Sequence, residues 1–301
     1  MIFSFCKITS LYTVNKEVAD LIKSLAMRLL IFYIFKAKIK ILKRLLILAV
    51  FTIISGQLLA QEEQEAPVRK EINEVPQFWI STNNVYRIAD KWSILNDLHI
   101  RRTDFIRNPN FYFLRVGAQY YVKDNIKLAG GYAHLWLTTI DSWIAYKNEN
   151  RIYQQFSVSQ KFPKLNTLFR LRTEQRFFND VFEGESLDNN LFVHRFRLLI
   201  SLGFPFKEGG KTQFMFADEI HLNFGKEVIY NTFNQNRLTL GIKHQLSKNW
   251  KFDCGYMMVY QQLATGFNYN LYHTFRLFFY GNFDFRKDKS VQFDEFRHGG
   301  E

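Results

Sequence analysis

Two short motifs in this sequence place a carboxylate two residues before an imidazole. Asp97 and His99 form one pair, and Glu219 and His221 form the other. If the two pairs were adjacent in the fold, they could hold a metal ion or act together as general acid and base. Such pairs also arise easily in alternating polar rows, where the side chains only hydrogen-bond to neighbours. We therefore predict no catalytic residue, no metal ligand and no cofactor.

A row of arginines offers a different chemistry. In residues 168–178, LFRLRTEQRFF, the residues Arg170, Arg172, Glu174 and Arg176 recur at every second position. A period of two is that of a β-strand, which carries one row of side chains on each face. The intervening row is apolar to neutral. Guanidinium groups bind carboxylates bidentately and stack on tyrosine rings, so the charged row suits an anion-binding or ion-paired face.

The same alternation recurs from Gln77 to Phe285 and must position these rows. The candidate strands are residues 77–88, 92–102, 111–122, 126–137, 150–161, 167–178, 190–204, 212–225, 236–246, 249–261 and 269–285. Short connections (89–91, 123–125, 162–166, 205–211 and 247–249) alternate with long ones (103–110, 138–149, 179–189, 226–235 and 262–268). Alternating tight turns and long loops are typical of up-and-down barrels in outer membranes.

Two architectures can use such strands. A soluble sandwich buries the apolar rows, whereas a membrane barrel turns them to lipid and encloses the polar rows. The apolar rows are long and rich in Phe, and the polar rows are rich in Arg rather than in Lys and Glu. We therefore predict an all-β fold, an antiparallel up-and-down transmembrane β-barrel of about 10–12 strands with a polar, Arg-rich lumen.

The strand count and the orientation leave an open question. Closed single-chain barrels usually have an even number of strands, so we expect the eleven segments to be miscounted by one. A further strand could lie within residues 62–76 or in VQFDEF, residues 291–296. A reversed orientation in the membrane is the other alternative.

Residues 1–60 have the features of a leader with a signal peptide. KIKILKRLLILAVFTIISGQLLAQ has a basic flank, then an apolar run from Leu45 to Ile54, and ends near Ala60 with the expected cleavage site. Met27 is a plausible start, which would make residues 1–26 a start-site artefact. We predict a flexible lead-in over 61–76, the barrel over 77–285, and a tail or last strand over 286–301. The predicted location is the outer membrane of a Gram-negative bacterium.

The leader also changes the meaning of the net charge of +12. Its 61 residues to Gln61 hold 9 Lys and Arg against 2 Asp and Glu, which leaves 31 basic and 26 acidic residues, a net of +5, in the other 240. That part of the chain has no concentrated basic patch, so we predict no nucleic-acid partner. It has one cysteine, Cys254, and therefore no internal disulfide.

If the charged rows face inward, they line one lumen. The predicted lumen-lining residues are Arg101, Arg115, Arg151, Arg170, Arg172, Glu174, Arg176, Arg195, Arg197, Glu219, Arg237 and Arg276, with Asp97, Asp253 and Asp284 as further acidic companions. Ten arginines against five carboxylates predict a net positive lumen. Such side chains can also pack a small barrel solid.

Several of these stretches resemble a known family. ENRIYQQ (149–155), RLRTEQRF (170–177), RFRL (195–198), DEI (218–220) and NRLTLGI (236–242) are similar to the pattern of the domain of unknown function 2490 family. The resemblance covers about residues 77–285 and implies an outer-membrane barrel of a Bacteroidetes-type bacterium. It implies no activity and no catalytic residue, and the tail is longer than the family pattern.

These observations lead to one preferred function and two alternatives. The expected protein is an outer-membrane barrel that contacts membrane lipid and serves as a narrow pore or binding barrel for small anionic solutes. A plugged barrel with a structural or surface-interaction role is the first alternative, and a barrel enzyme acting on lipid is the second. The sequence identifies no protein partner.

Overall fold

The computed structural model describes residues 69–139, 142–179, 181–182, 185–186 and 191–286, and this part of the chain is built of β-strands. No helix in these residues has the length and apolar character needed to cross a membrane. The strands are β1 (Glu71–Ala89), β2 (Trp92–Thr103), β3 (Asn108–Lys123), β4 (Ile126–Thr139), β5 (Ser142–Lys161), β6 (Asn166–Phe178), β7 (Val181–Phe182), β8 (Glu185–Ser186), β9 (Leu191–Pro205), β10 (Thr212–Phe224), β11 (Phe233–Gln245), β12 (Trp250–Gln262) and β13 (Asn268–Asp284).

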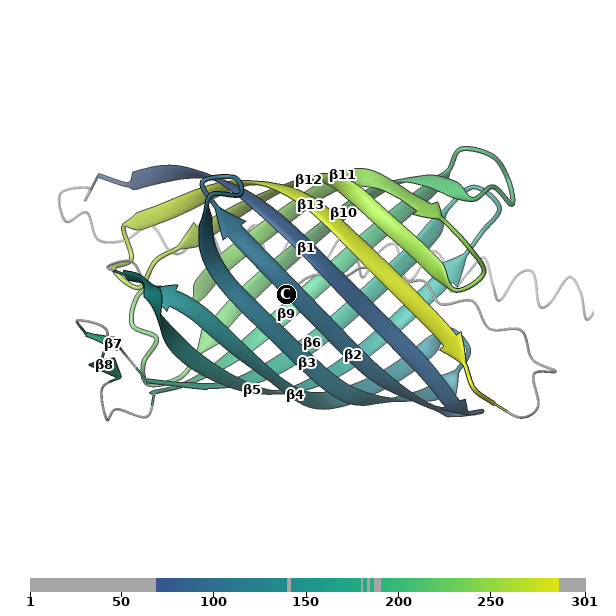
Figure 1. Cartoon of the computed structure of the whole chain (residues 1–301), viewed down its shortest axis with the longest axis horizontal. Coiled ribbons are helices and arrows are strands. Elements are labelled where there is room, and N and C mark those ends of the chain that lie inside the picture. Colours follow the sequence, from purple (N-terminus) through teal and green to yellow (C-terminus); the bar gives the residue numbers. More distant parts are fainter. Residues whose placement is uncertain (1–68, 140–141, 180, 183–184, 187–190, 287–301) are drawn as a thin grey trace, which may run out of the picture. The chain divides into compact units, whose positions relative to one another are not determined.

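Eleven of these strands form one closed barrel, which confirms the predicted all-β barrel. Its order is β1-β13-β12-β11-β10-β9-β6-β5-β4-β3-β2, while β7 and β8 pair with each other outside it (Figure 1). Strands adjacent in the chain pair antiparallel, so with an odd number the first and last run in the same direction. The barrel accordingly closes through a parallel pair, β1 with β13, in register from Glu71 opposite Asn268 to Arg87 opposite Asp284.

The expectation of an even strand count is therefore wrong for the described residues. Two segments were candidates for an additional strand. Of residues 62–76, the part 62–68 lies outside the described residues, and residues 291–296 lie wholly outside them. Residues 71–76, predicted as flexible lead-in, are instead the first residues of β1. Their sequence alternates poorly, and it is pairing along the backbone of β13 that extends the strand.

The connections define two ends of the barrel. The turn end carries residues 90–91, 124–125, 162–165, 206–211 and 246–249. Of the described residues, the loop end carries 104–107, 225–232 and 263–267, together with the last residues of β4 and β6 and the first of β5 and β9. The predicted long loop over 138–149 is wrong, because β5 begins at Ser142 and pairs with β4 there. The polar run Lys147–Asn150 is thus part of a strand and not of a loop.

The two faces of the sheet differ in polarity as the strand period requires. In β9, Arg195, Arg197 and Ser201 are buried inside, whereas Phe196 and Ile200 are exposed outside, with Ile200 50% exposed. Most large exposed side chains elsewhere on the strands are also apolar. The charged row of residues 168–178 likewise faces inward. The barrel therefore has an apolar exterior and a polar interior.

A close approach between β3 and β4 explains two glycines. Gly117 and Gly131 are direct partners across this strand pair. The ring of Tyr153 lies over both: a Cβ at Gly131 would come within 2.5 Å of the Gly117 Cα and 3.0 Å of the Tyr153 ring. A large aromatic ring packed over paired glycines restores the contact area that those glycines lack.

We predict that Gly131→Ala destabilises the barrel and that Gly130→Ala does not. The new Cβ at Gly131 would lie 2.2 Å from the Val116 carbonyl oxygen, a backbone atom that cannot move aside cheaply. Overpacking of this kind costs about 1–3 kcal/mol. At Gly130 the nearest atom is at 3.4 Å, an ordinary contact. Urea midpoints of the two variants folded in detergent measure the difference, and equal midpoints would contradict the prediction.

Candidate functional site: the charged interior of the barrel

The structure encloses the predicted charged residues inside the barrel. Eleven of the twelve are buried, and Arg176, at the end of β6, is half-buried. They come from β2, β3, β5, β6, β9, β10, β11 and β13, and strand alternation turns each of them inward. The predicted companions Asp97 and Asp253 are buried as well, whereas Asp284 lies at the end of β13 and pairs with Arg286.

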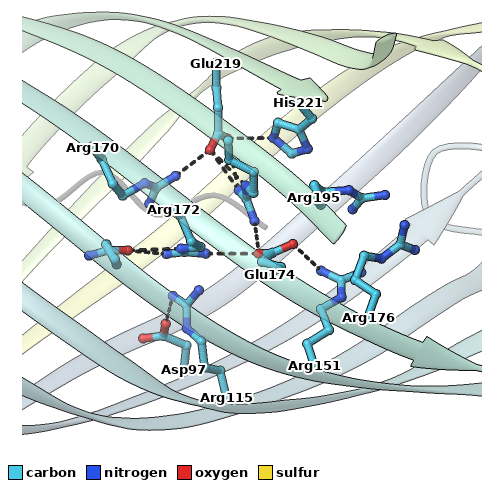
Figure 2. A network of polar contacts seen from close by, with 12 residues as sticks. Asp97, Arg115, Arg151, Arg170, Arg172, Glu174, Arg176, Arg195, Glu219 and His221 are labelled. Atoms are coloured by element: carbon cyan, nitrogen blue, oxygen red, sulfur yellow. Dashed lines mark hydrogen bonds and ion pairs between the residues drawn. The ribbon is translucent and has the colours of Figure 1, made fainter. Parts of the chain in front are cut away.

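A shared ion-pair cluster crosses the middle of the interior, and we name it the central layer: Arg170, Arg172, Arg197, Glu174 and Glu219. Arg197 lies between the two carboxylates, donating Nη1 to Glu174 at 2.8 Å and Nη2 to Glu219 at 3.1 Å. Arg170 donates to Glu219 at 2.7 Å, and Arg172 lies 3.7 Å from Glu174. Figure 2 shows these side chains converging on the two carboxylates from neighbouring strands.

Strand register explains why this layer needs both carboxylates. Arg172 of β6 and Arg197 of β9 are direct cross-strand partners, an arrangement of like charges that is destabilising by itself. Glu174 follows on the same row of β6, and Glu219 lies on β10 beyond Arg197. The two carboxylates therefore lie diagonally on either side of the arginine pair and neutralise it.

Glu149 forms a second cluster toward the loop end, and the sequence analysis missed it. Its carboxylate accepts from Arg151 Nε at 2.7 Å and from Arg176 through Nε at 2.5 Å and Nη2 at 2.8 Å. Arg151 and Arg176 are again direct partners across two strands. Glu149 was placed in a loop, although its position two residues before Arg151 was the signal that could have identified it.

Two further carboxylates each neutralise part of the interior. Asp253 of β12 accepts two bonds from Arg276, at 3.0 Å each, and a hydrogen bond from the hydroxyl of Tyr280. Asp97 of β2 pairs with Arg115 of β3, its direct neighbour in the register. Both carboxylates are fully enclosed, so each pair relies on protein partners rather than on water.

Aromatic rings stabilise arginine side chains that lie where the interior has few carboxylates. The guanidinium of Arg101 lies 3.4 Å from the ring centre of Trp79 and 4.2 Å from that of Phe111. Arg237 approaches the same indole at 5.2 Å. Cations over ring faces gain about 0.5–2 kcal/mol, more when they are desolvated. Stacking therefore adds to the ion pairs in stabilising the enclosed arginines.

The two carboxylate–imidazole pairs lie in different surroundings. The His99 ring packs edge-on against Phe113 and Phe278, with centres 5.1 and 5.5 Å apart. His221 Nε2 lies 3.2 Å from Glu219, which already contacts arginines of the central layer. In the part of the chain that the structure describes, no group of three or more His, Cys, Asp or Glu side chains is arranged to hold a metal ion.

Two cavities lie at opposite ends of the interior. The turn-end cavity, about 480 Å³, is lined by Lys161, Lys211, Lys243, Lys251 and Tyr280 among others. The loop-end cavity, about 210 Å³, is lined by five arginines: Arg101, Arg151, Arg176, Arg195 and Arg237. The two cavities share no lining residue. The central layer lies on rows of β6, β9 and β10 between their ends.

The balance of enclosed charge is strongly positive. Among the described residues, thirteen Lys and Arg side chains are buried against five Asp and Glu. The carboxylates are therefore shared, as Glu219 is shared by Arg170 and Arg197. Both cavities border this cationic interior, so what the arrangement can do chemically is attract and bind anions at either end.

These features define a class of protein: a closed β-barrel with an apolar exterior and an arginine-rich interior. This chain belongs to the family described as protein of unknown function (DUF2490), whose model matches residues 76–270, from β1 into β13. The resemblance found in the sequence is thereby confirmed. No curated protein and no solved structure matches the chain.

We predict that Arg197→Gln destabilises the barrel by about 3–5 kcal/mol, because removing one partner leaves Glu174 and Glu219 enclosed without their shared cation. Arg107, exposed between β2 and β3, supplies a matched control. Arg107→Gln should change the free energy of unfolding by less than about 0.5 kcal/mol. Urea unfolding in detergent measures both, and similar values for the two variants would show that the central layer is not stabilised by Arg197.

Proposed function

We propose that this chain is an outer-membrane β-barrel of a Gram-negative bacterium, exported by a cleaved signal peptide, which binds small anionic solutes without forming an open pore. The observation that carries the proposal is the inverted polarity of the barrel: most of its large apolar side chains are exposed, and most of its interior arginines are buried. A soluble protein gains stability by the opposite arrangement, since apolar surface is buried away from water. A lipid-facing exterior supplies the reason for the inversion.

The lengths of the strands agree with a location in a membrane. The barrel strands run from 12 residues in β2 to 20 in β5. A strand tilted by about 45° needs about 9–11 residues to cross the hydrocarbon core. The exposed apolar rows include Leu98 and Ile100 on β2 and Phe169 and Leu171 on β6. These rows would contact membrane lipid, the first partner we propose.

The filled middle of the barrel favours binding over conduction. Arg197 and Arg276 are at most 1% exposed, and Phe278 and Met215 are fully enclosed. Side chains covered this well support a filled interior rather than a continuous water path. An open pore would require the central layer to move, whereas binding at the loop-end or turn-end cavity requires no rearrangement.

The positive interior favours anions as solutes. Arginine forks bind carboxylates and phosphates, and charge of one sign in a recess of low dielectric constant concentrates counter-ions.

The two alternative functions have less structural support. A surface-interaction role depends on residues 179–190, which the structure describes only in part. A lipid enzyme requires a nucleophile or base directed to the exterior, and we propose no catalytic residue.

Lipid contact can be tested with single-tryptophan variants in liposomes of brominated lipid. Trp136 faces outward and is 38% exposed, whereas Trp79 lies inside and is 3% exposed. We expect bromine to quench a variant that retains only Trp136 strongly and a variant that retains only Trp79 weakly. The protein is the full chain purified from membranes, with folding checked by heat-modifiable gel mobility. Absence of quenching at Trp136 in folded protein would refute the proposed location in the membrane.

Conductance across a planar bilayer tests the closed interior. We expect no discrete steps from the wild type, because the central layer fills the middle. The double variant Arg197→Ala with Glu219→Ala removes one charge of each sign and opens the layer, so we expect steps with an anion preference under a salt gradient. Heat-modifiable mobility shows whether the variant has folded. Regular steps from wild-type protein would contradict the closed-barrel proposal and favour a pore.

A further inference from the structure

The loop-end cavity contains one arginine whose charge the protein leaves available. Arg195 of β9 is 6% exposed and lines the cavity. Its Nε donates to Asn223 Oδ1 at 3.0 Å. Within the described residues its two terminal nitrogens make no hydrogen bond and no ion pair. Figure 2 shows Arg195 beside the central layer, with no contact drawn to either glutamate.

Such a group is costly unless something completes its hydrogen bonding. The terminal nitrogens of Arg195 are not among the buried donors that lack a partner, so they are open to the cavity, where an acceptor can complete their hydrogen bonding. Its neighbours Arg151 and Arg176 are engaged with Glu149, so this carboxylate is already occupied by two cations. No acidic residue lines the cavity. An anion entering it would meet the free side of the Arg195 fork.

The rest of the wall determines what kind of anion fits. Besides the arginines, the lining includes the apolar side chains Leu135, Leu137 and Val259 and the rings of Trp79, Phe111 and Tyr272. The amides of Gln77, Asn110, Gln235 and Gln261 complete it. A fully hydrated anion such as inorganic phosphate would leave the apolar part of this wall without a partner. The volume of about 210 Å³ lies below the about 300–1,000 Å³ typical of sites for drug-sized ligands. The ligand is thus small, with an apolar body and one charged end.

We infer that the loop-end cavity is a binding site for a small organic carboxylate, whose two oxygens accept from the terminal nitrogens of Arg195 and whose apolar body packs on Leu135, Leu137 and Val259. A carboxylate matches the spacing of the guanidinium fork, which gives two parallel hydrogen bonds. This site specifies the ligand class of the proposed function and rests on that function for its role in solute binding. The geometry of the site does not depend on it.

Benzoate is a suitable probe, with benzamide as its neutral counterpart and inorganic phosphate as an anion without an apolar body. Calorimetry on the folded full chain should show that benzoate binds at least tenfold more tightly than either. Arg195→Gln should weaken benzoate binding at least tenfold. Arg195→Lys, which keeps the charge but not the fork, should fall between. Lys248→Gln, exposed between β11 and β12 and outside both cavities, should leave the affinity unchanged, and heat-modifiable mobility verifies each variant's fold.

The outcomes separate this site from the general proposal. Benzoate binding that Arg195→Gln leaves unchanged, or that Lys248→Gln weakens equally, would overturn the site while anion binding stands. Tighter binding of phosphate than of benzoate would overturn the ligand class. Loss with Arg195→Gln that Arg195→Lys fully restores would overturn the bidentate contact. Absence of binding by any anion to folded wild-type protein would overturn both the site and the proposed solute-binding role.

Discussion

A guanidinium enclosed by protein requires a carboxylate, a ring or another acceptor, and this requirement organises the interior of the barrel. Arg197 meets it by lying between Glu174 and Glu219, which come from strands on either side of it. That contact depends on the register of β6, β9 and β10, because a slip of one residue would turn the whole charged row outward. The ion pairs therefore specify strand alignment more than they add net stability, since desolvation offsets much of their attraction.

The shortage of carboxylates links this constraint to function. Five enclosed acidic groups cannot provide a separate partner for each of thirteen enclosed cations. Sharing and ring stacking accommodate most of the excess: Glu219 serves several arginines, and Trp79 lies under Arg101. What remains is a positive field at both cavities and a fork at Arg195 with donors unused. If the interior served only to stabilise the barrel, replacing such a cation by a neutral side chain would increase the stability. The excess of positive charge therefore supports a role in binding anions.

The period of two made the barrel and the inward charges predictable, because on a strand each residue's face follows from its parity. Arg170 and Arg195 could be assigned to the interior without any tertiary information. What parity cannot supply is where a strand begins and ends. Glu149 was missed since a polar run looks like a loop until its pairing with β4 is known. The parallel closure of β1 on β13 was also missed, because pairing between chain ends has no local signal. For the same reason the sequence could not assign a partner to each arginine or delimit the cavities.

The width of the barrel explains why arginine, rather than a shorter cation, occupies the inner rows. Barrel diameter grows with strand number, and a barrel of about eight strands is already just wide enough for side chains to fill. Eleven strands leave a wider space, which long side chains must cross to meet. Arg170 of β6 reaches Glu219 of β10 past the intervening β9, and Arg237 of β11 lies over Trp79 of β1, beyond β12 and β13. Toward the two ends, long side chains such as Arg195 and Lys243 line the cavities together with Gln235 and Gln213. Long cationic side chains thus serve two purposes: between the strand ends they meet carboxylates, and toward the ends they line the cavities.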